Sequence, residues 1–235
     1  MPRFTTDAII LHCIDFLESD KIVCAFTKDR GVIHAIAKGA KSSKKRFPGT
    51  LEPFCEVILD LFSRKSSDLL RIESAHLTNA NLAIREDLEL LAHASVLIEL
   101  VKEHLGELDP SPATYVSLRT ALSAMEPGVQ WFSIWCISMV NILSSLGYGI
   151  ELIDRREIQP NQRNDYASGK LTKEAYLFMV KGSRLDKEVL AKLKINRDVR
   201  KEITEYLLLL CNRVSEKKLK TAAFLAKLLD LNIIQ

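Results

Sequence analysis

The period of the hydrophobic residues changes once along this chain, close to Asn79, and that change restricts the possible folds more than any other feature. Before it, short apolar runs separated by turn signals predict five strands. The predicted strands are Thr6–Ile14, Lys21–Thr27, Val32–Ala37, Glu56–Phe62 and Leu69–Leu77. Five short strands at this spacing are typical of a small closed barrel. We therefore predict that residues 1–79 form a five-stranded OB-fold β-barrel.

After Asn79, apolar residues recur every three or four positions, as they do on one face of an α-helix. Besides an uncharged segment in the middle of this part, helices are predicted at Arg85–Leu105, Pro112–Met125, Thr172–Val180, Asp186–Leu193, Asp198–Cys211 and Lys218–Leu231. The chain as a whole is therefore predicted to have an α+β multidomain fold, in which residues 80–235 form an all-α helical domain.

The uncharged segment runs from Pro127 to Ile150 and is long enough to cross a membrane. Polar residues such as Gln130 and Asn141 interrupt it, and no basic residues flank it. A helix that is apolar on most faces, within an otherwise charged chain, is typical of the centre of a helical bundle. We therefore predict a buried helix here and no membrane partner.

A basic loop, defined as residues 38–49, separates the third and fourth predicted strands. It contains five cations and the aromatic residue Phe47, and no Asp or Glu occurs between Arg30 and Glu52. Such a loop favours a phosphate backbone with a base stacked nearby, although a lysine-rich hairpin kept basic for solubility has the same composition. About four of the six Phe residues in the barrel are expected inside, and Phe47 is expected to be exposed. The candidate nucleic-acid contacts are Arg30, Lys38, Lys41, Lys44, Lys45, Arg46 and Phe47.

The sequence contains no recognisable catalytic or cofactor motif. Its five Cys residues are odd in number, scattered and never two positions apart, which argues against a disulfide framework and a zinc site. They are expected to be reduced, mostly buried thiols. The five His residues lack metal-ligand spacing, and no Gly-rich phosphate loop is present. The N-terminus does not resemble a secretory signal, so an intracellular protein is expected. We predict no enzyme activity, no catalytic residue, no metal and no cofactor.

Several motifs together carry a resemblance to a known family. In order, Phe26–Gly31, Ala37–Lys41, Phe47 and Leu51–Phe54 follow the pattern of the RecO recombination mediators, and Leu146–Gly149 resembles that family's Leu-Gly segment. The resemblance covers nearly the whole chain and is most specific in the barrel.

The resemblance implies a non-enzymatic protein that binds single- and double-stranded DNA and anneals complementary strands. The resemblance also implies that the protein acts together with RecR, and in some cases with RecF, to load RecA on DNA coated by the single-stranded DNA-binding protein. The implied location is the cytoplasm, at the nucleoid. Many members carry a four-cysteine zinc module after the Leu-Gly segment. Ile153–Met179 contains no Cys here, so no zinc-finger module is predicted.

The helical domain is expected to recognise a protein partner through an apolar groove with a basic rim. The resemblance implies that this partner is the C-terminal tail of the single-stranded DNA-binding protein. The candidate partner contacts are Arg155, Arg156, Arg213, Lys217, Lys218 and Lys220. An RNA-binding OB-fold protein with a helical extension, acting in translation or on the ribosome, remains the alternative, because a basic loop does not distinguish DNA from RNA.

Overall fold

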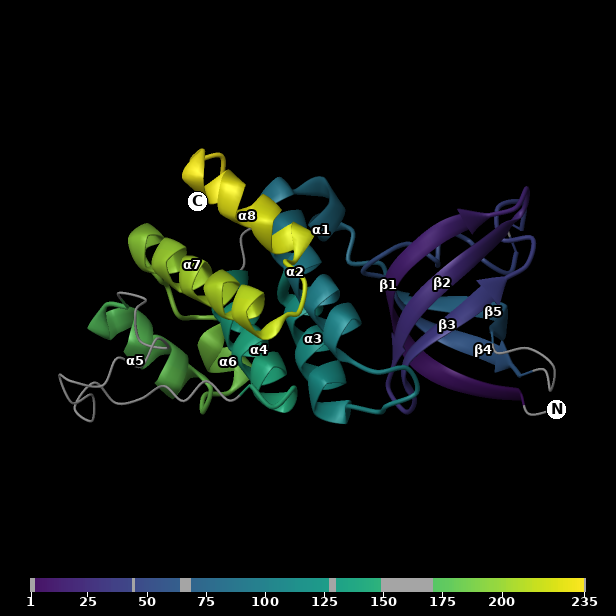
Figure 1. The fold of residues 1–235 in the computed structure, drawn as a ribbon, viewed down its shortest axis with the longest axis horizontal. Coiled ribbons are helices and arrows are strands. Elements are labelled where there is room, and N and C mark those ends of the chain that lie inside the picture. The colour runs from purple at the N-terminus through teal and green to yellow at the C-terminus, as the bar shows by residue number, and fades with distance from the viewer. Residues whose placement is uncertain (1–2, 44, 64–68, 127–129, 149–170, 235) are drawn as a thin grey trace.

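The computed structural model describes residues 3–234 except 44, 64–68, 127–129 and 149–170. The strands β1 (Arg3–Phe16), β2 (Asp20–Thr27), β3 (Gly31–Ala37), β4 (Glu56–Phe62) and β5 (Leu70–Asn79) form a closed barrel in the order β1-β2-β3-β5-β4 (Figure 1). The β3–β5 pair is parallel and the other pairs are antiparallel. The predicted α+β fold with an N-terminal five-stranded barrel is confirmed.

The barrel closes because alternate residues of each strand are apolar and point inward. Val23, Ala25, Ile33, Leu59 and Ile72 are among the residues that fill its interior. Small alanines allow the opposite walls of so narrow a barrel to approach each other, while branched residues occupy the remaining volume.

The helices follow as α1 (Ala83–Glu86), α2 (Leu88–His104), α3 (Pro112–Ala124), α4 (Trp131–Ser145), α5 (Lys173–Gly182), α6 (Lys187–Leu190), α7 (Arg197–Val214) and α8 (Lys220–Asp230). Instead of the single helix predicted at Arg85–Leu105, the structure has two. The backbone at Asp87 is extended, and its carboxylate caps α2 by accepting hydrogen bonds from the amides of Glu89 and Leu90.

Helix α4 is the buried centre of the bundle, as predicted. Trp135 is fully buried within it, and its indole Nε1–H donates to the carbonyl of His93 at 3.0 Å. In the part of the chain that the structure describes, no helix is long and apolar enough to cross a membrane. All five Cys residues are free and only Cys13 is not fully buried, which confirms the expectation of reduced, mostly buried thiols.

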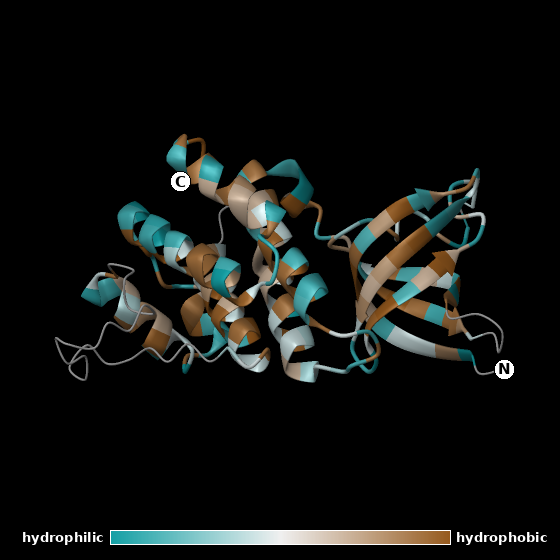
Figure 2. Ribbon diagram, viewed as in Figure 1, coloured by the Kyte–Doolittle hydropathy of each residue, from teal (hydrophilic) through white to brown (hydrophobic). Residues whose placement is uncertain are grey.

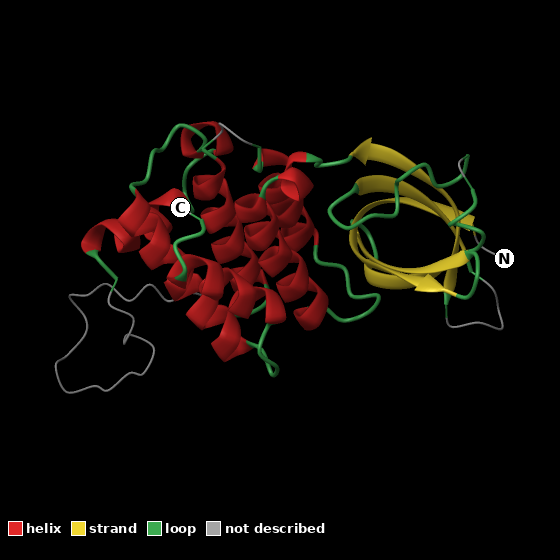
Figure 3. Cartoon of the chain, turned by 90° about the horizontal axis from the view of Figure 1, so that it is seen from above, coloured by secondary structure: helices red, strands yellow, loops and turns green. Residues whose placement is uncertain are grey.

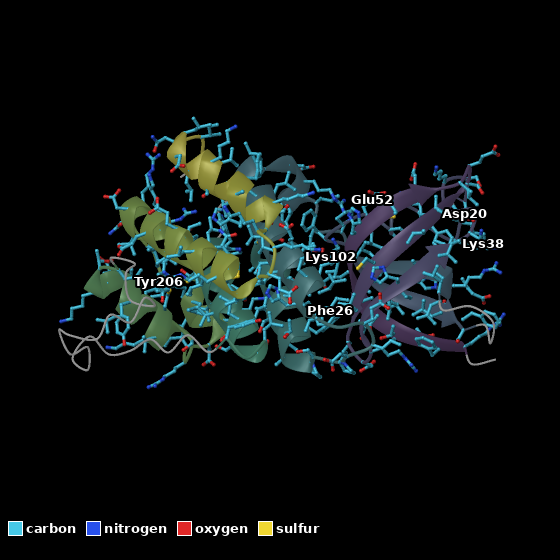
Figure 4. All side chains as sticks on the ribbon, in the orientation of Figure 1. Asp20, Phe26, Lys38, Glu52, Lys102 and Tyr206 are labelled. Carbon is cyan, nitrogen blue, oxygen red and sulfur yellow. The ribbon has the colours of Figure 1, made fainter. Side chains whose placement is uncertain are left out.

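The barrel and the bundle share one hydrophobic core, although they are seen as two blocks in Figure 3. The outer side of β1–β3 contributes Ile9, Phe26 and Val32 to the core of the helices. Phe26 lies at the junction of the two parts in Figure 4, with its ring edge-on to Tyr115 at a centroid distance of 5.5 Å. The part of this surface around Phe26 is therefore not available to a ligand.

A polar clamp supports the same junction. The buried carboxylate of Glu56, at the start of β4, accepts hydrogen bonds from Arg119 Nε and Ser123 Oγ on α3, both at 2.8 Å. On β3, the Val32 carbonyl accepts a bond of 3.0 Å from the amide of Leu108. The helices therefore fix which face and which end of the barrel remain free.

Candidate nucleic-acid interface

The basic loop lies against the β1–β2 hairpin at one end of the barrel. The amide of Lys41 donates to the Ser19 carbonyl at 3.0 Å, and the amide of Gly39 donates to Asp20 Oδ1 at 2.8 Å. Figure 4 shows Asp20 and Lys38 together at the end of the barrel farther from the helices. The loop is thus a fixed part of an end that the bundle does not cover.

No acidic residue lies near this loop in sequence, but two acidic side chains lie beside it in the structure. The hairpin brings in Asp15, which forms an ion pair of 3.0 Å with Lys41, and Asp20. The Gly39 amide and then the Ser19 hydroxyl, by hydrogen bonding to the Asp20 carboxylate, lower its pKa, and the charge of Lys38 adds to this effect. The acids were missed because they are distant in sequence and reach the loop only through the strand register.

Lys38 and Lys45 are exposed and make no side-chain hydrogen bond or ion pair with another described residue. Lys44 lies outside the described residues. Lys41 is engaged with Asp15 and also donates to the Leu17 carbonyl at 3.2 Å. Of the loop cations that the structure describes, Lys38 and Lys45 are therefore the most available to a phosphate group.

The expectation that Phe47 is exposed and able to stack on a base is also wrong. Its ring is buried in the barrel core. The cause is a backbone pairing, because the carbonyl of Arg46 accepts a hydrogen bond of 3.1 Å from the amide of Ala75 on β5. Arg46 covers the ring, with its guanidinium carbon 5.1 Å from the centroid, and Arg46 Nη2 donates to the Lys38 carbonyl at 2.8 Å. Both residues hold the loop in shape.

The exposed aromatic residue beside the basic loop is Phe16, at the end of β1, with 38% of its surface accessible. Ile14 on the same strand is also exposed, and it pairs with Ile22, which pairs with Ile36. An apolar row therefore crosses the outside of β1–β3 next to the free cations. The alternation of Ile14 and Phe16 just before a turn was the sequence signal for this row. In all, three of the six barrel Phe residues are buried instead of about four: Phe26, Phe47 and Phe54.

Arg30 does not join this group. It lies in the turn between β2 and β3, at the opposite end of β3 from Lys38. The seven extended residues of β3 lie between them, which separates the two positions by about 25 Å. The Arg30 guanidinium instead stacks on Phe4, with its carbon 3.9 Å from the ring centroid.

The described candidate partner residues lie together at the junction of α7 and α8. Arg213, Lys217, Lys218 and Lys220 are all exposed there. Arg155 and Arg156 lie outside the described residues. These four cations form a basic surface at this junction, and their part in binding a partner stays a prediction.

A mainly apolar cleft of about 330 Å³ opens beside this junction, between the barrel and the bundle. Leu11 and Phe54 line it from the barrel, and Ile98 and Lys102 line it from α2. Thr221, which also lines it, donates to Glu99 through its amide at 2.8 Å, so the Glu99 carboxylate is engaged with α8.

Within the described ranges, no three His, Cys, Asp or Glu side chains come together in a way that could hold a metal ion. The prediction that no zinc-finger module is present concerns Ile153–Met179, of which residues 153–170 lie outside the described ranges. It therefore stays a prediction.

An OB barrel with a basic free end, packed through its other side on a helical bundle, defines a class of two-part OB-fold proteins. Comparison with known families makes this specific: residues 1–81 match the model described as "Recombination protein O N terminal", and residues 85–223 match "Recombination protein O C terminal". The chain belongs to the RecO family.

Curated relatives agree with this assignment. The DNA repair protein RecO of Geobacter metallireducens is 36% identical over 152 residues, which are 65% of this chain and 62% of that protein. The DNA repair protein RecO of Myxococcus xanthus is 33% identical over 126 residues, 54% of this chain and 51% of that protein. The matched part spans about half to three-fifths of these two relatives. The Koribacter versatilis protein of the same name is 27% identical over 240 residues, 95% of this chain and 98% of its own length.

Proposed function

We propose that this protein is a non-enzymatic, DNA-binding recombination mediator that anneals complementary single strands during DNA repair at the nucleoid. The observation that carries the proposal is the free end of the barrel, where Lys38 and Lys45 pair with no other described side chain and the loop that holds them lies against the hairpin that carries the exposed ring of Phe16. Membership of the RecO family, whose curated relatives are named DNA repair proteins, supports it.

The chemistry of this end suits annealing. Two DNA strands repel each other, so a protein that neutralises their phosphates lowers the barrier to their encounter. Contacts to the backbone leave the base edges free to pair, and one ring such as Phe16 stacks on any base regardless of sequence. A rigid helix that reads base edges would hinder pairing, and the free end of this barrel presents loops and strands instead.

The proposal includes partners. As a mediator, the protein works with RecR, and in some cases with RecF, to promote RecA loading on DNA coated by the single-stranded DNA-binding protein. The acidic C-terminal tail of that protein enters the cleft between α2, α8 and the barrel, where Leu11, Phe54 and Ile98 accept its terminal apolar side chain. Lys102 and Lys220 attract its acidic residues.

The test is annealing of complementary DNA strands already coated by the single-stranded DNA-binding protein. The double variant Lys38→Glu/Lys45→Glu should anneal them at least about tenfold more slowly at low salt, since two phosphate contacts become repulsive. The matched control is Lys28→Glu/Lys227→Glu, which changes the net charge equally at two exposed sites far from the loop. Equal annealing by wild type and loop variant would refute the proposal, and equal activity on RNA strands would favour the RNA-binding alternative.

The tail site is tested separately with a synthetic acidic peptide that ends in an apolar residue. Ser95→Trp places a large ring in the cleft and should abolish peptide binding while DNA affinity stays unchanged. Lys102→Glu should lower the affinity for the peptide and reduce the salt dependence of its binding. Peptide binding that survives both substitutions would place the tail elsewhere.

A further inference from the structure

A second group of exposed cations lies in the helical domain, between the end of α5 and the start of α7. Residues 181–197 contain six Lys or Arg and only two acids, although the net charge of the whole chain is only +3. We call the six cations the outer basic surface, and all of them are exposed: Lys181, Arg184, Lys187, Lys192, Lys194 and Arg197. The basic loop has fewer unpaired cations among its described residues.

The segment that carries these cations is fixed to the bundle. Leu190 is buried, and the carbonyl of Leu193 accepts a hydrogen bond of 3.0 Å from Ser133 Oγ on α4. Gly182 packs so closely on α4 that a Cβ there would lie 2.7 Å from Ile137 Cδ1. Asn196 caps α7 through a bond of 2.8 Å from the Val199 amide. The cations therefore project from a rigid scaffold, which lowers the ordering entropy that binding costs.

Their charges are not compensated by neighbouring acids. Among the described residues, no carboxylate oxygen lies within 4.0 Å of any of the six cationic groups, whereas the neighbouring Arg200 on α7 forms an ion pair of 2.6 Å with Glu89. Arg197 is the first residue of α7, where a positive charge is unfavourable beside the helix dipole. Mutual repulsion of this kind is relieved when a polyanion binds.

We propose that the outer basic surface binds the phosphate backbone of nucleic acid, as a site separate from the basic loop. Six cations spread along seventeen residues fit a ligand whose negative charges repeat at a regular spacing. An acidic peptide is the weaker fit, because such peptides need an apolar anchor and only Leu185 and Val189 are exposed apolar residues in this segment.

The outer basic surface lies far from the basic loop, so the two sites could hold different strands. In Figure 1 the order from left to right is α5, α6, α4, α3 and then the barrel, so α6 lies on the far side of α4 and α3 from the barrel. Figure 2 colours the end of α7 farthest from the barrel as hydrophilic. One chain can then hold one strand at the barrel and another at the bundle. This two-strand arrangement rests on the proposed function, whereas phosphate binding by the outer surface does not.

The test is the triple variant Arg184→Glu/Lys187→Glu/Lys192→Glu, with mixed-sequence single-stranded and duplex DNA as the probes. Affinity at low salt should fall at least about tenfold. The slope of log K against log salt on duplex DNA should decrease by about 0.9 for each phosphate that the variant no longer neutralises. The milder variant Arg184→Gln/Lys187→Gln/Lys192→Gln should change both quantities in the same direction by a smaller amount.

The matched control is Arg3→Glu/Lys28→Glu/Lys227→Glu, which changes the net charge equally at exposed sites outside this segment and outside the basic loop. Wild-type affinity in the outer-surface variant, or an equal loss in the control, would overturn the proposal. Loss of binding to a poly-glutamate peptide with DNA affinity intact would also overturn it, in favour of an acidic protein partner.

The two sites are separated by comparing loop and outer-surface variants. If Lys38→Glu/Lys45→Glu leaves DNA binding unchanged and the outer-surface variant loses it, the outer site stands and the proposed role of the barrel fails. If each variant loses only part of the affinity, a second measurement uses two labelled, non-complementary strands. The wild-type protein should bring them together and give energy transfer between the labels, and each variant should abolish that energy transfer. That result would support one chain holding two strands.

Discussion

Replacing Gly31 by alanine should destabilise this protein much more than the same change at Gly49. Both glycines have a positive φ, +69° and +67°. Alanine in that conformation costs about 1–2 kcal/mol at either site. At Gly31, however, the added Cβ would lie 2.1 Å from the carbonyl oxygen of Asp109, whereas at Gly49 nothing lies within 4 Å.

The extra cost at Gly31 comes from the junction of barrel and bundle. Asp109 must move, and with it the backbone that gives the 3.0 Å hydrogen bond from the Leu108 amide to the carbonyl of Val32. Val32 is buried, so an unsatisfied carbonyl there adds about 1–3 kcal/mol. Gly31→Ala should therefore lower the free energy of unfolding by about 2–5 kcal/mol, against about 1–2 kcal/mol for Gly49→Ala.

Urea unfolding measures both variants. Fluorescence of Trp131 and Trp135 reports on the bundle, and circular dichroism reports on the helices and strands together. Equal losses in the two variants would refute the reasoning, because they would mean that the segment around Asp109 is not seated on the barrel.

Three further predictions follow from the described contacts. On single-stranded DNA, Lys38→Glu/Lys45→Glu should reduce the slope of log K against log salt by about 1.4, which is about 0.7 for each of two lost phosphate contacts. Isothermal titration calorimetry at several salt concentrations would measure this slope. Phe47→Ala should cost about 3–5 kcal/mol of stability in urea, whereas Phe16→Ala should keep stability and weaken single-stranded DNA binding by about 1–3 kcal/mol; the reverse pattern would contradict both assignments. Burial lowers the pKa of His93 from 6.5 to about 3, so below pH 6.5 the unfolded chain binds a proton that the folded chain excludes. His93 should therefore make the free energy of unfolding fall as the pH drops from 6.5 towards 3, by up to about 1.4 kcal/mol per pH unit, and His93→Gln should reduce the measured slope by that amount.

Much of the fold could be predicted from periodicity. The β4 range was predicted as observed, and α3 was predicted to within one residue. The two periods, two residues and 3.6 residues, are local properties that a short window reveals. The break at Asp87 was missed because Asp is favoured both at the N-cap and in the first turn of a helix, and only the extended backbone shows that this carboxylate caps α2.

The candidate site was predicted less well, for a different reason. Charge and composition marked the basic loop as a candidate site, but the roles of its residues depend on what lies across the barrel. Asp15 compensates Lys41 because of the hairpin register, and Phe47 is buried because the loop pairs with Ala75 on β5. Neither neighbour is within twenty residues of its partner in sequence.

The sequence by itself determined the two kinds of secondary structure, the buried centre of the bundle at α4, and the family to which the chain belongs. Only the tertiary structure decided which side of the barrel is free, which cations are unpaired, and that Phe16 instead of Phe47 is exposed. The physical reason is that amphipathic periodicity is set by adjacent residues, whereas burial and ion pairing depend on strand register and on the packing of the helices against β1–β3.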